Sequence, residues 1–343
     1  MKSLALLAAL ALPVPALAQE EPPTPASVVA ASQPSEWKAI APDDLLVMEL
    51  APDAAGKPRE VVIQLLPPPF SQPWVENIRT LARAHWWDRK SVYRVVDNWV
   101  AQWGGGDPEM DMDPGPMPAR LIDTDGLSYI SETQVDLSSG QFDPPVFPLM
   151  APDPYTGLVS DDPRVVFMGG ISGFSLGWPI ALLPYGEVPT LEDIDDPPTG
   201  SSTARIWPVH CYASVGVARD LAPDTGTGSE LYAVIGHAPR QLDRNIAVVG
   251  RVIEGNEHLS TLPRGTGDAG VYETRAEDTP ILSVRLASGM AEPPAFEYLG
   301  TDSDSFARYV AVRANRKDSF YEVPAGGVDV CNVGVPIRRA GSE

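Results

Sequence analysis

The sequence predicts a mostly-β protein, built as a closed or nearly closed antiparallel barrel that is capped by helices. Three observations lead to this prediction. Short segments rich in Val, Ile, Leu and Tyr recur along the chain between turn residues, which is typical of all-β barrels and sandwiches. Helical periodicity is confined to one or two segments. With 343 residues, 43% of them hydrophobic, the chain is long enough to bury at least one sizeable core.

The N-terminal 18 residues, MKSLALLAALALPVPALA, have the pattern of a secretory signal peptide. A basic Lys2 precedes an apolar run from Leu4 to Leu12, and Ala16-Leu17-Ala18 forms a small-residue cleavage site. The run is far shorter than the ~20 residues needed to span a bilayer, and no later segment is long enough. We therefore expect cleavage after Ala18, no membrane insertion of the mature chain, and a periplasmic or secreted location. Residues 19–42, rich in Pro, Ala and Ser, predict a flexible leader.

The folded part is expected to begin at residue 43. Leu45 to Leu50 and Glu60 to Leu66 are strand candidates, and the turn-forming run APDAAGKPR between them predicts a hairpin. Apolar residues then recur at helical spacing up to Ala84, after Ser71 as a predicted N-cap and a proline in the first turn. Ser91 to Val96 and Trp99 to Trp103 are the next predicted strands.

Four more strands are predicted well downstream: Cys211 to Ala218, Leu231 to Ile235, Ala247 to Ile253 and Ile281 to Ala287. The barrel is therefore expected to span 43–290, with an insertion at about 108–205. Runs such as DPEMDMDPGPMP and EDIDDPPTG cannot form regular helix or central strand, but the apolar patches VVFMGGISGF and WPIALLPYG predict that part of the insertion packs on the barrel. A C-terminal extension, 291–343, is expected to add strands or a short helix.

Charge and cysteine content restrict the partners and the compartment. The formal net charge of −21 makes nucleic acids and anionic membranes poor partners, whereas neutral or basic polypeptide is a better one. Two cysteines in an exported chain, Cys211 and Cys331, predict one disulfide between a mid-chain strand and the C-terminal tail. Two separately buried thiols are the alternative, because the sequence does not show whether the two Cα atoms come within bonding range.

Two segments resemble a known family. VYRVVDNWVAQWGGGD at 92–107 and SVGVARDLAPDTGTGSELYAVI at 214–235 are similar to the cyclophilin-type peptidyl-prolyl isomerase motifs F-H-R-I-I-P-G-F-M-x-Q-G-G-D and S-M-A-N-x-G-P-x-T-N-G-S-Q-F-F-I. The resemblance covers roughly 43–107 and 211–290. It implies a closed eight-stranded antiparallel barrel that isomerises X-Pro bonds, here those of exported polypeptides whose folding it assists, without a metal or cofactor.

Position by position, the resemblance places the family's catalytic arginine at Arg94. It places the substrate-binding residues of the groove at Trp99, Val100, Gln102, Ala218, Arg219, Glu230, Tyr232 and Leu242. Two rim positions depart from the family, since its tryptophan falls on Gln241 and its histidine on Ile246. Glu230 adds a negative charge where the family has a neutral amide, and it is a candidate ion-pair partner for Arg219 across the groove wall.

The chemistry of these residues fits the implied reaction. Amide resonance resists rotation of an X-Pro bond with a barrier of ~18–20 kcal/mol, and the twisted transition state restores a lone pair on the proline nitrogen. A guanidinium such as Arg94, charged at any working pH, can donate to that nitrogen and so bind the twisted form better than the planar one. Gln102 would hold the substrate carbonyl or steer Arg94. The pyrrolidine ring would lie in a dry pocket of Trp99, Val100, Tyr232 and Leu242.

Two other functions fit parts of the sequence. The altered rim and the large insertion allow a weakly active or inactive cyclophilin-like module that binds proline-containing peptides or a protein partner. Gly173-Phe174-Ser175-Leu176-Gly177 matches the G-x-S-x-G motif of serine hydrolases, with His210, His237 and His258 as candidate bases. That motif requires a strand before it and a helix after it, whereas Trp178-Pro179 follows at once.

Phosphate and metal motifs are weak. Thr225 to Ser229 (TGTGS) resembles a phosphate-binding loop, but no lysine follows, so a plain turn is expected. The four histidines lack metal-ligand spacing. The acidic runs around Asp111 and at Glu192 to Asp196 lack the calcium-loop pattern, and we interpret them as solvated charge.

Overall fold

The computed structural model describes residues 22–106, 112–118, 120–136, 139, 141–152, 170–184 and 201–341, with residues 150–152 and 184 described by their backbone alone. The predicted signal peptide with its cleavage site at Ala18 lies outside these residues. So do Asp107 to Asp111 of the first acidic run, and Glu192 to Asp196. Across the described residues, no helix combines the length and the apolar character that a membrane span requires.

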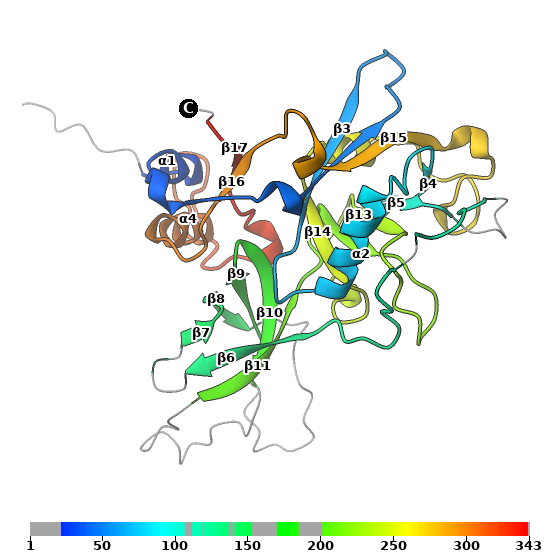
Figure 1. Ribbon diagram of the computed structural model, residues 1–343. Coiled ribbons are helices and arrows are strands. Elements are labelled where there is room, and N and C mark those ends of the chain that lie inside the picture. The colour runs from blue at the N-terminus through cyan, green and yellow to red at the C-terminus, as the bar shows by residue number, and fades with distance from the viewer. Residues whose placement is uncertain are drawn as a thin grey trace, which may run out of the picture.

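Eight antiparallel strands close into a barrel in the order β12-β13-β5-β4-β15-β2-β3-β14 (Figure 1), so the predicted fold class is confirmed. The strands are β2 (Leu45–Leu50), β3 (Arg59–Leu65), β4 (Ser91–Val95), β5 (Val100–Gly104), β12 (Ser214–Val217), β13 (Leu231–Val234), β14 (Val248–Glu254) and β15 (Thr279–Leu286). The predicted hairpin is β2 paired with β3. Closure leaves no exposed sheet edge in the barrel.

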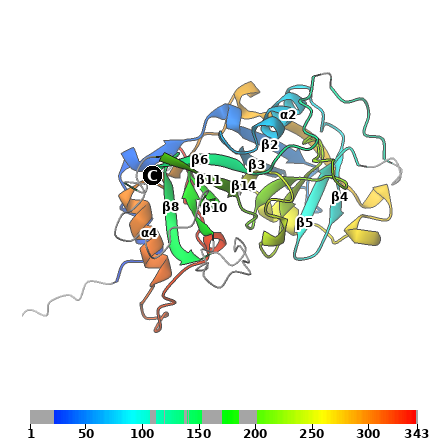
Figure 2. The same cartoon turned by 90° about the horizontal axis from the view of Figure 1, so that it is seen from below.

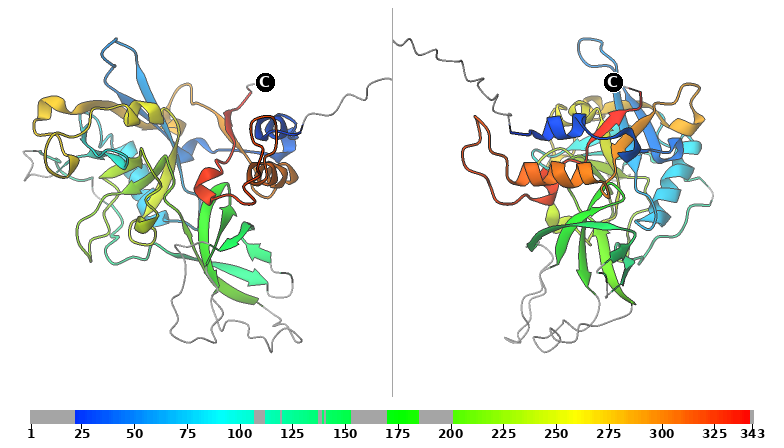
Figure 3. Two further views of the ribbon diagram at one scale, coloured as in Figure 1. Left: turned by 180° about the vertical axis from the view of Figure 1, so that it is seen from behind. Right: turned by 90° about the vertical axis from the view of Figure 1, so that its left-hand side faces the viewer.

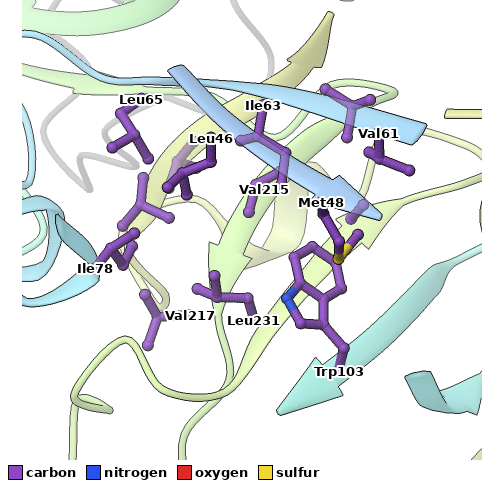
Figure 4. Close-up of a cluster of buried hydrophobic side chains, with 14 of the residues drawn as sticks. Leu46, Met48, Val61, Ile63, Leu65, Ile78, Trp103, Val215, Val217 and Leu231 are labelled. Carbon is purple, nitrogen blue, oxygen red and sulfur yellow. The ribbon is translucent and has the colours of Figure 1, made fainter. Parts of the chain in front are cut away.

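The barrel core explains why β2 and β3 read as continuous apolar runs rather than as alternating ones. Leu46 and Met48 point inward, opposite Ile63 and Val61 of β3, and pack with residues from the other strands (Figure 4). Side chains of the opposite parity, such as Leu45 and Val62, are also fully buried, against Ile40, Ala287 and Phe296 outside the barrel. Both faces of this hairpin are therefore covered, as in strands buried between two layers.

Helix α2 (Gln72–Arg83) closes one end of the barrel, with Trp74, Val75, Ile78 and Leu81 in the barrel core. The helix and its first-turn proline agree with the prediction. The predicted capping role of Ser71 is wrong, because this residue adopts a left-handed conformation with φ 50° and its side chain makes no capping hydrogen bond. A shorter helix, α3 (Asn256–Ser260), follows β14.

The insertion forms a second antiparallel sheet, in the order β7-β6-β11-β10-β9-β8. Its strands are β6 (Ser131–Asp136), β7 (Gln141–Asp143), β8 (Val146–Pro152), β9 (Ile171–Ser175), β10 (Trp178–Pro184) and β11 (Ser201–Pro208). As its apolar patches predict, part of the insertion packs on the barrel, since Trp178, Ile180 and Leu182 of β10 belong to the barrel's hydrophobic cluster. Figure 2 shows this sheet beside α4, away from β4 and β5.

The two ends of the chain fold together. A three-stranded sheet pairs β1 (Trp37–Ala39) with β16 (Phe296–Leu299) and β16 with β17 (Ile337–Arg339). Helix α1 (Pro25–Ala30) packs beside α4 (Asp304–Ala314), as both views of Figure 3 show. The prediction of a flexible leader over 19–42 is therefore wrong from residue 25 onward. Its composition is that of a linker, but its partners lie about 260 residues away in the sequence, where no local pattern reveals them.

The predicted disulfide is formed. Cys211 and Cys331 are bonded, with their Cα atoms 5.0 Å apart and a sequence separation of 120. Cys331 lies in the short 3-10 turn Val330–Asn332 of the extension. The bond thus joins the segment that enters β12 to the C-terminal extension.

Candidate active site

A groove of about 320 Å³ lies on the outer wall of the barrel, over β4, β5 and β13 and the loops beside them. Every lining residue that the structure describes comes from the barrel strands or from their connecting loops. They are Tyr93, Arg94, Trp99, Val100, Gln102, Ala218, Arg219, Tyr232, Leu242, Ile246, Ala269 and Val271. The structure therefore brings together every predicted groove residue except Glu230.

Strand pairing places the central residues side by side. After a bulge in β4, Arg94 pairs with Gln102 of β5, and Gln102 pairs in turn with Tyr232 of β13. Directly opposed residues on neighbouring antiparallel strands project from the same face. The three side chains consequently form a row across three strands, although Tyr232 is 130 residues beyond Gln102 in the sequence.

Two acceptors orient the guanidinium of Arg94. Its Nη1 donates to Gln102 Oε1 at 2.9 Å, and its Nε donates to the carbonyl oxygen of Ala269 at 2.7 Å. The guanidinium carbon lies 5.5 Å from the centre of the Trp99 ring. Burial lowers the pKa of Arg94, yet arginine stays protonated in proteins. Nη2 has no acceptor within the described part of the chain, so this cation retains donors for a ligand in the groove.

The rest of the groove is apolar. Val100 and Tyr232 are buried and pack with the partly buried side chains of Trp99, Ala218, Leu242 and Ile246. The hydroxyl of Tyr232 lies 2.9 Å from His210 Nε2, and His210 Nδ1 lies 2.9 Å from Asp243. Because this buried chain of partners satisfies the hydroxyl, the tyrosine ring can serve as an apolar wall.

Glu230 occupies a different place from the one predicted for a substrate-binding residue. Its carboxylate accepts hydrogen bonds from the Tyr93 hydroxyl at 2.9 Å and from the Gly106 amide at 3.1 Å. Burial raises the pKa of Glu230 to about 7, against the lowering effect of these hydrogen bonds. The suggested ion pair with Arg219 is also wrong, because Arg219 donates to the carbonyl oxygens of Asn245 and Asp220.

Four lining residues were absent from the predicted site. Ile246, which departs from the family's histidine, lines the groove, whereas Gln241, where the family has tryptophan, is not among the lining residues. Tyr93 stands next to Arg94 in the motif, so its position was an available signal. Ala269 and Val271 belong to the loop between β14 and β15, which has no motif. A single bridge between Val271 and Arg94 places that loop on the groove.

The hydrolase interpretation is wrong. Ser175 ends β9, and Leu176 and Gly177, both with positive φ, turn the chain into β10, whose Trp178 pairs with Ser175. A β-hairpin therefore replaces the strand-to-helix elbow that the motif requires. Ser175 is also completely buried. Across the described residues no cluster of three or more His, Cys, Asp or Glu side chains is placed to hold a metal ion.

The barrel and its groove, with a fixed arginine–glutamine pair over a small apolar pocket, define a peptidyl-prolyl isomerase of the β-barrel class. The family model described as "Cyclophilin type peptidyl-prolyl cis-trans isomerase/CLD" matches residues 71–286, well over half of the chain. The chain belongs to the cyclophilin-type peptidyl-prolyl cis-trans isomerase family, and it catalyses cis-trans isomerisation of X-Pro bonds.

Among solved structures, the fold is similar to cyclophilin AquaCyp293 from Hirschia baltica, with a TM-score of 0.54 and 19% identity over 94% of this chain and 100% of that one. This likeness extends the shared fold beyond the barrel. A cyclophilin-type isomerase from Cryptosporidium parvum matches at 11% identity with a TM-score of 0.34, over 71% of this chain and 96% of that one. Its structure in the presence of the dipeptide Ala-Pro matches at 10% identity and 0.34, over 70% and 98%. No curated protein matches the chain.

Proposed function

We propose that Arg94 is the catalytic cation of this isomerase and that its substrates are prolyl segments of exported polypeptides. The observation that supports the assignment is the placement of Arg94, a fixed cation at the edge of an apolar pocket. The guanidinium is held by Gln102 and by the Ala269 carbonyl, while Nη2 stays available to a ligand.

The reaction needs a donor that acts on the twisted amide and not on the planar one. In the planar X-Pro bond the nitrogen lone pair is delocalised into the carbonyl. At the transition state the nitrogen becomes pyramidal and its lone pair becomes an acceptor. A donor fixed in advance at that position stabilises the transition state selectively, which lowers the barrier.

The neighbours of Arg94 strengthen this effect. The apolar wall of the groove, where Val100 is only 2% exposed, accommodates a pyrrolidine ring and excludes water. A hydrogen bond from a cation is stronger in such a low-dielectric setting than in bulk water. Gln102 keeps the guanidinium in one orientation, so little reorganisation is needed during the reaction.

Export is the second part of the proposal. The signal-peptide pattern at 1–18 supports it, as does the Cys211–Cys331 disulfide, since disulfides persist mainly in oxidising compartments. The strong negative charge suits neutral or basic polypeptide clients. N-terminal sequencing of the protein recovered from a periplasmic fraction is expected to begin at Gln19. A chain that stays in the cytosol and begins at Met1 would contradict export.

The catalytic assignment is tested with Arg94→Ala, assayed by NMR exchange on an Ala-Pro peptide. We expect kcat/KM to fall by ~10²-fold or more, the range for loss of one preorganised donor, with little change in stability. Arg83→Ala is the matched control, since Arg83 lies on α2 and its side chain is 54% exposed. Equal rates for wild type and Arg94→Ala would overturn the assignment and leave the groove as a peptide-binding site.

A further inference from the structure

A chain of hydrogen bonds runs from Glu230 to Arg94. The Tyr93 hydroxyl donates to Glu230 Oε2, Gln102 Nε2 donates to the Tyr93 hydroxyl oxygen, and Arg94 Nη1 donates to Gln102 Oε1. We propose that ionised Glu230 is a positioning residue which, through Tyr93 and Gln102, fixes the orientation of the Arg94 guanidinium, and that its protonation switches the isomerase to a slower form. This inference rests on the proposed role of Arg94.

The direction of the chain follows from what each group can donate and accept. An ionised carboxylate only accepts, so Tyr93 must give its single proton to Glu230. The Tyr93 oxygen is then left as an acceptor and takes a proton from the amide nitrogen of Gln102. That leaves the amide oxygen of Gln102 facing the guanidinium, which is the arrangement Arg94 requires.

Both oxygens of Glu230 are used in this arrangement. Oε2 accepts from Tyr93 while Oε1 accepts from the backbone N–H of Gly106. Because the two donors meet different oxygens, a side chain that carries a donor group at one of these two positions cannot accept both hydrogen bonds. Protonation of Glu230 or its replacement by glutamine would therefore turn a donor toward Tyr93, because the Gly106 N–H can only donate whereas the Tyr93 hydroxyl can also accept.

Reversal at Tyr93 would be transmitted along the chain. If the Tyr93 oxygen accepts from residue 230, its own proton must go to Gln102, whose amide then turns its oxygen toward Tyr93. The amide nitrogen would face Arg94, so that two donors oppose each other. The guanidinium would lose one of its two fixed acceptors and retain only the Ala269 carbonyl.

The surroundings of Glu230 are built for a carboxylate. Gly104 packs directly against it, and an added Cβ at that position would collide with the carboxylate oxygens. The charged and titratable groups that face it are Tyr93 from β4 and Lys90, which lies just before β4. The Lys90 ammonium donates to the Pro114 carbonyl and lies over the Trp86 ring, 3.9 Å from its centre, so Glu230 has a cation nearby but no direct ion pair among the described residues.

The pH at which the switch operates follows from burial. Burial raises the pKa of Glu230 to about 7, so the carboxylate form is lost as the pH falls through the neutral range. Burial also raises the pKa of Tyr93, which keeps its proton on the phenol throughout that range. Activity is therefore expected to rise with pH as Glu230 ionises.

The test compares wild type, Glu230→Gln and Tyr93→Phe on an Ala-Pro peptide between pH 5.5 and 8.5. NMR exchange is the assay, because it needs no coupling protease whose own activity would change with pH. For wild type we expect kcat/KM to rise about 3- to 10-fold with pH, the scale of one net hydrogen bond. Glu230→Gln should stay at the low-pH rate throughout. Glu322→Gln is the matched control, because Glu322 is an exposed glutamate of the extension, and it should follow the wild-type profile.

The double variant identifies the route. In a Tyr93→Phe background the connection is already broken, so Glu230→Gln should cause no further loss and no pH step should remain. A flat wild-type profile, or a Glu230→Gln variant that keeps both the pH step and the full rate at pH 8.5, would overturn the inference. These outcomes are separable from failure of the proposed function, which is decided by Arg94→Ala alone.

Discussion

At the residue scale, two opposing effects act on the charge of Glu230. Its carboxylate is the form that we expect to orient the catalytic arginine, yet burial disfavours that charge, which is why its pKa is raised to about 7. Functional groups held in an unfavourable charge state at the working pH are common at catalytic sites. The cost of holding this charge should therefore be measurable in the stability of the fold.

We predict that Glu230 makes the protein less stable as the pH rises. Its pKa is about 7 when folded against the usual 4.5, so between those values the folded state binds more protons than the unfolded state and the free energy of unfolding falls. At about 1.4 kcal/mol per pH unit, the full fall is at most roughly 3 kcal/mol. Urea unfolding of wild type and Glu230→Gln should show a difference that grows from pH 4.5 to pH 7 and then levels off. A constant difference would contradict the prediction.

At the scale of single elements, the strands of the barrel could be predicted because their signals are local. Apolar runs, turn residues and one segment of helical periodicity each act over a few neighbours, and β2, β3, β4 and β5 lie close to the predicted bounds. Elements whose partners are distant could not be predicted in this way. Strand β1 has no apolar pattern of its own and exists because β16 pairs with it from the other end of the chain.

The residues of the candidate site also fall into those that a local motif identifies and those that it does not. Arg94 and Gln102 could be placed because they share one motif, and Tyr232 because it lies within the second motif. The hydrogen bond between Tyr93 and Glu230 could not be predicted, because it depends on how two side chains that are distant in the sequence meet in the folded barrel. The loop with Ala269 and Val271 reaches the groove only through the barrel's closure.

The folded N-terminal segment is expected to contribute to the stability of the protein. Trp37 of β1 is 8% exposed, and the Arg338 guanidinium lies 3.8 Å from the centre of its ring. We expect Trp37→Ala to lower the free energy of unfolding by about 3 kcal/mol, as for other buried large-to-small changes, whereas a flexible leader would give no loss. Chemical denaturation measures the change, with exposed Tyr212→Ala as the control.

At the scale of the whole molecule, the additions to the barrel form a connected structure. Side chains on one face of β10 enter the barrel core, while Ala181 and Leu183 on its other face pack into a second cluster that includes Phe306 and Tyr309 of α4. The second sheet thus lies between the barrel and the extension. The disulfide fastens this arrangement, since Cys211 and Cys331 lie in the second cluster or against it.

Reduction of the Cys211–Cys331 disulfide is therefore expected to lower the stability of the whole fold. The bond closes a loop of 120 residues, and loss of such a bond is expected to destabilise the fold by ~2–4 kcal/mol. Thermal unfolding with and without reductant measures the effect. A Cys211→Ser, Cys331→Ser double variant should melt at the temperature of the reduced wild-type protein, whether or not reductant is present. A melting curve that does not change on reduction would speak against a stabilising role for the bond.

Among the described residues, the second sheet and the layer formed by the two chain ends lie on the side of the barrel away from β4 and β5 (Figure 2), and the described lining of the groove comes from the barrel strands and their loops. The substrate polypeptide thus needs neither a free end nor passage through a closed chamber to reach the groove. We therefore expect the groove to accept an internal proline of a polypeptide as readily as one near a chain end.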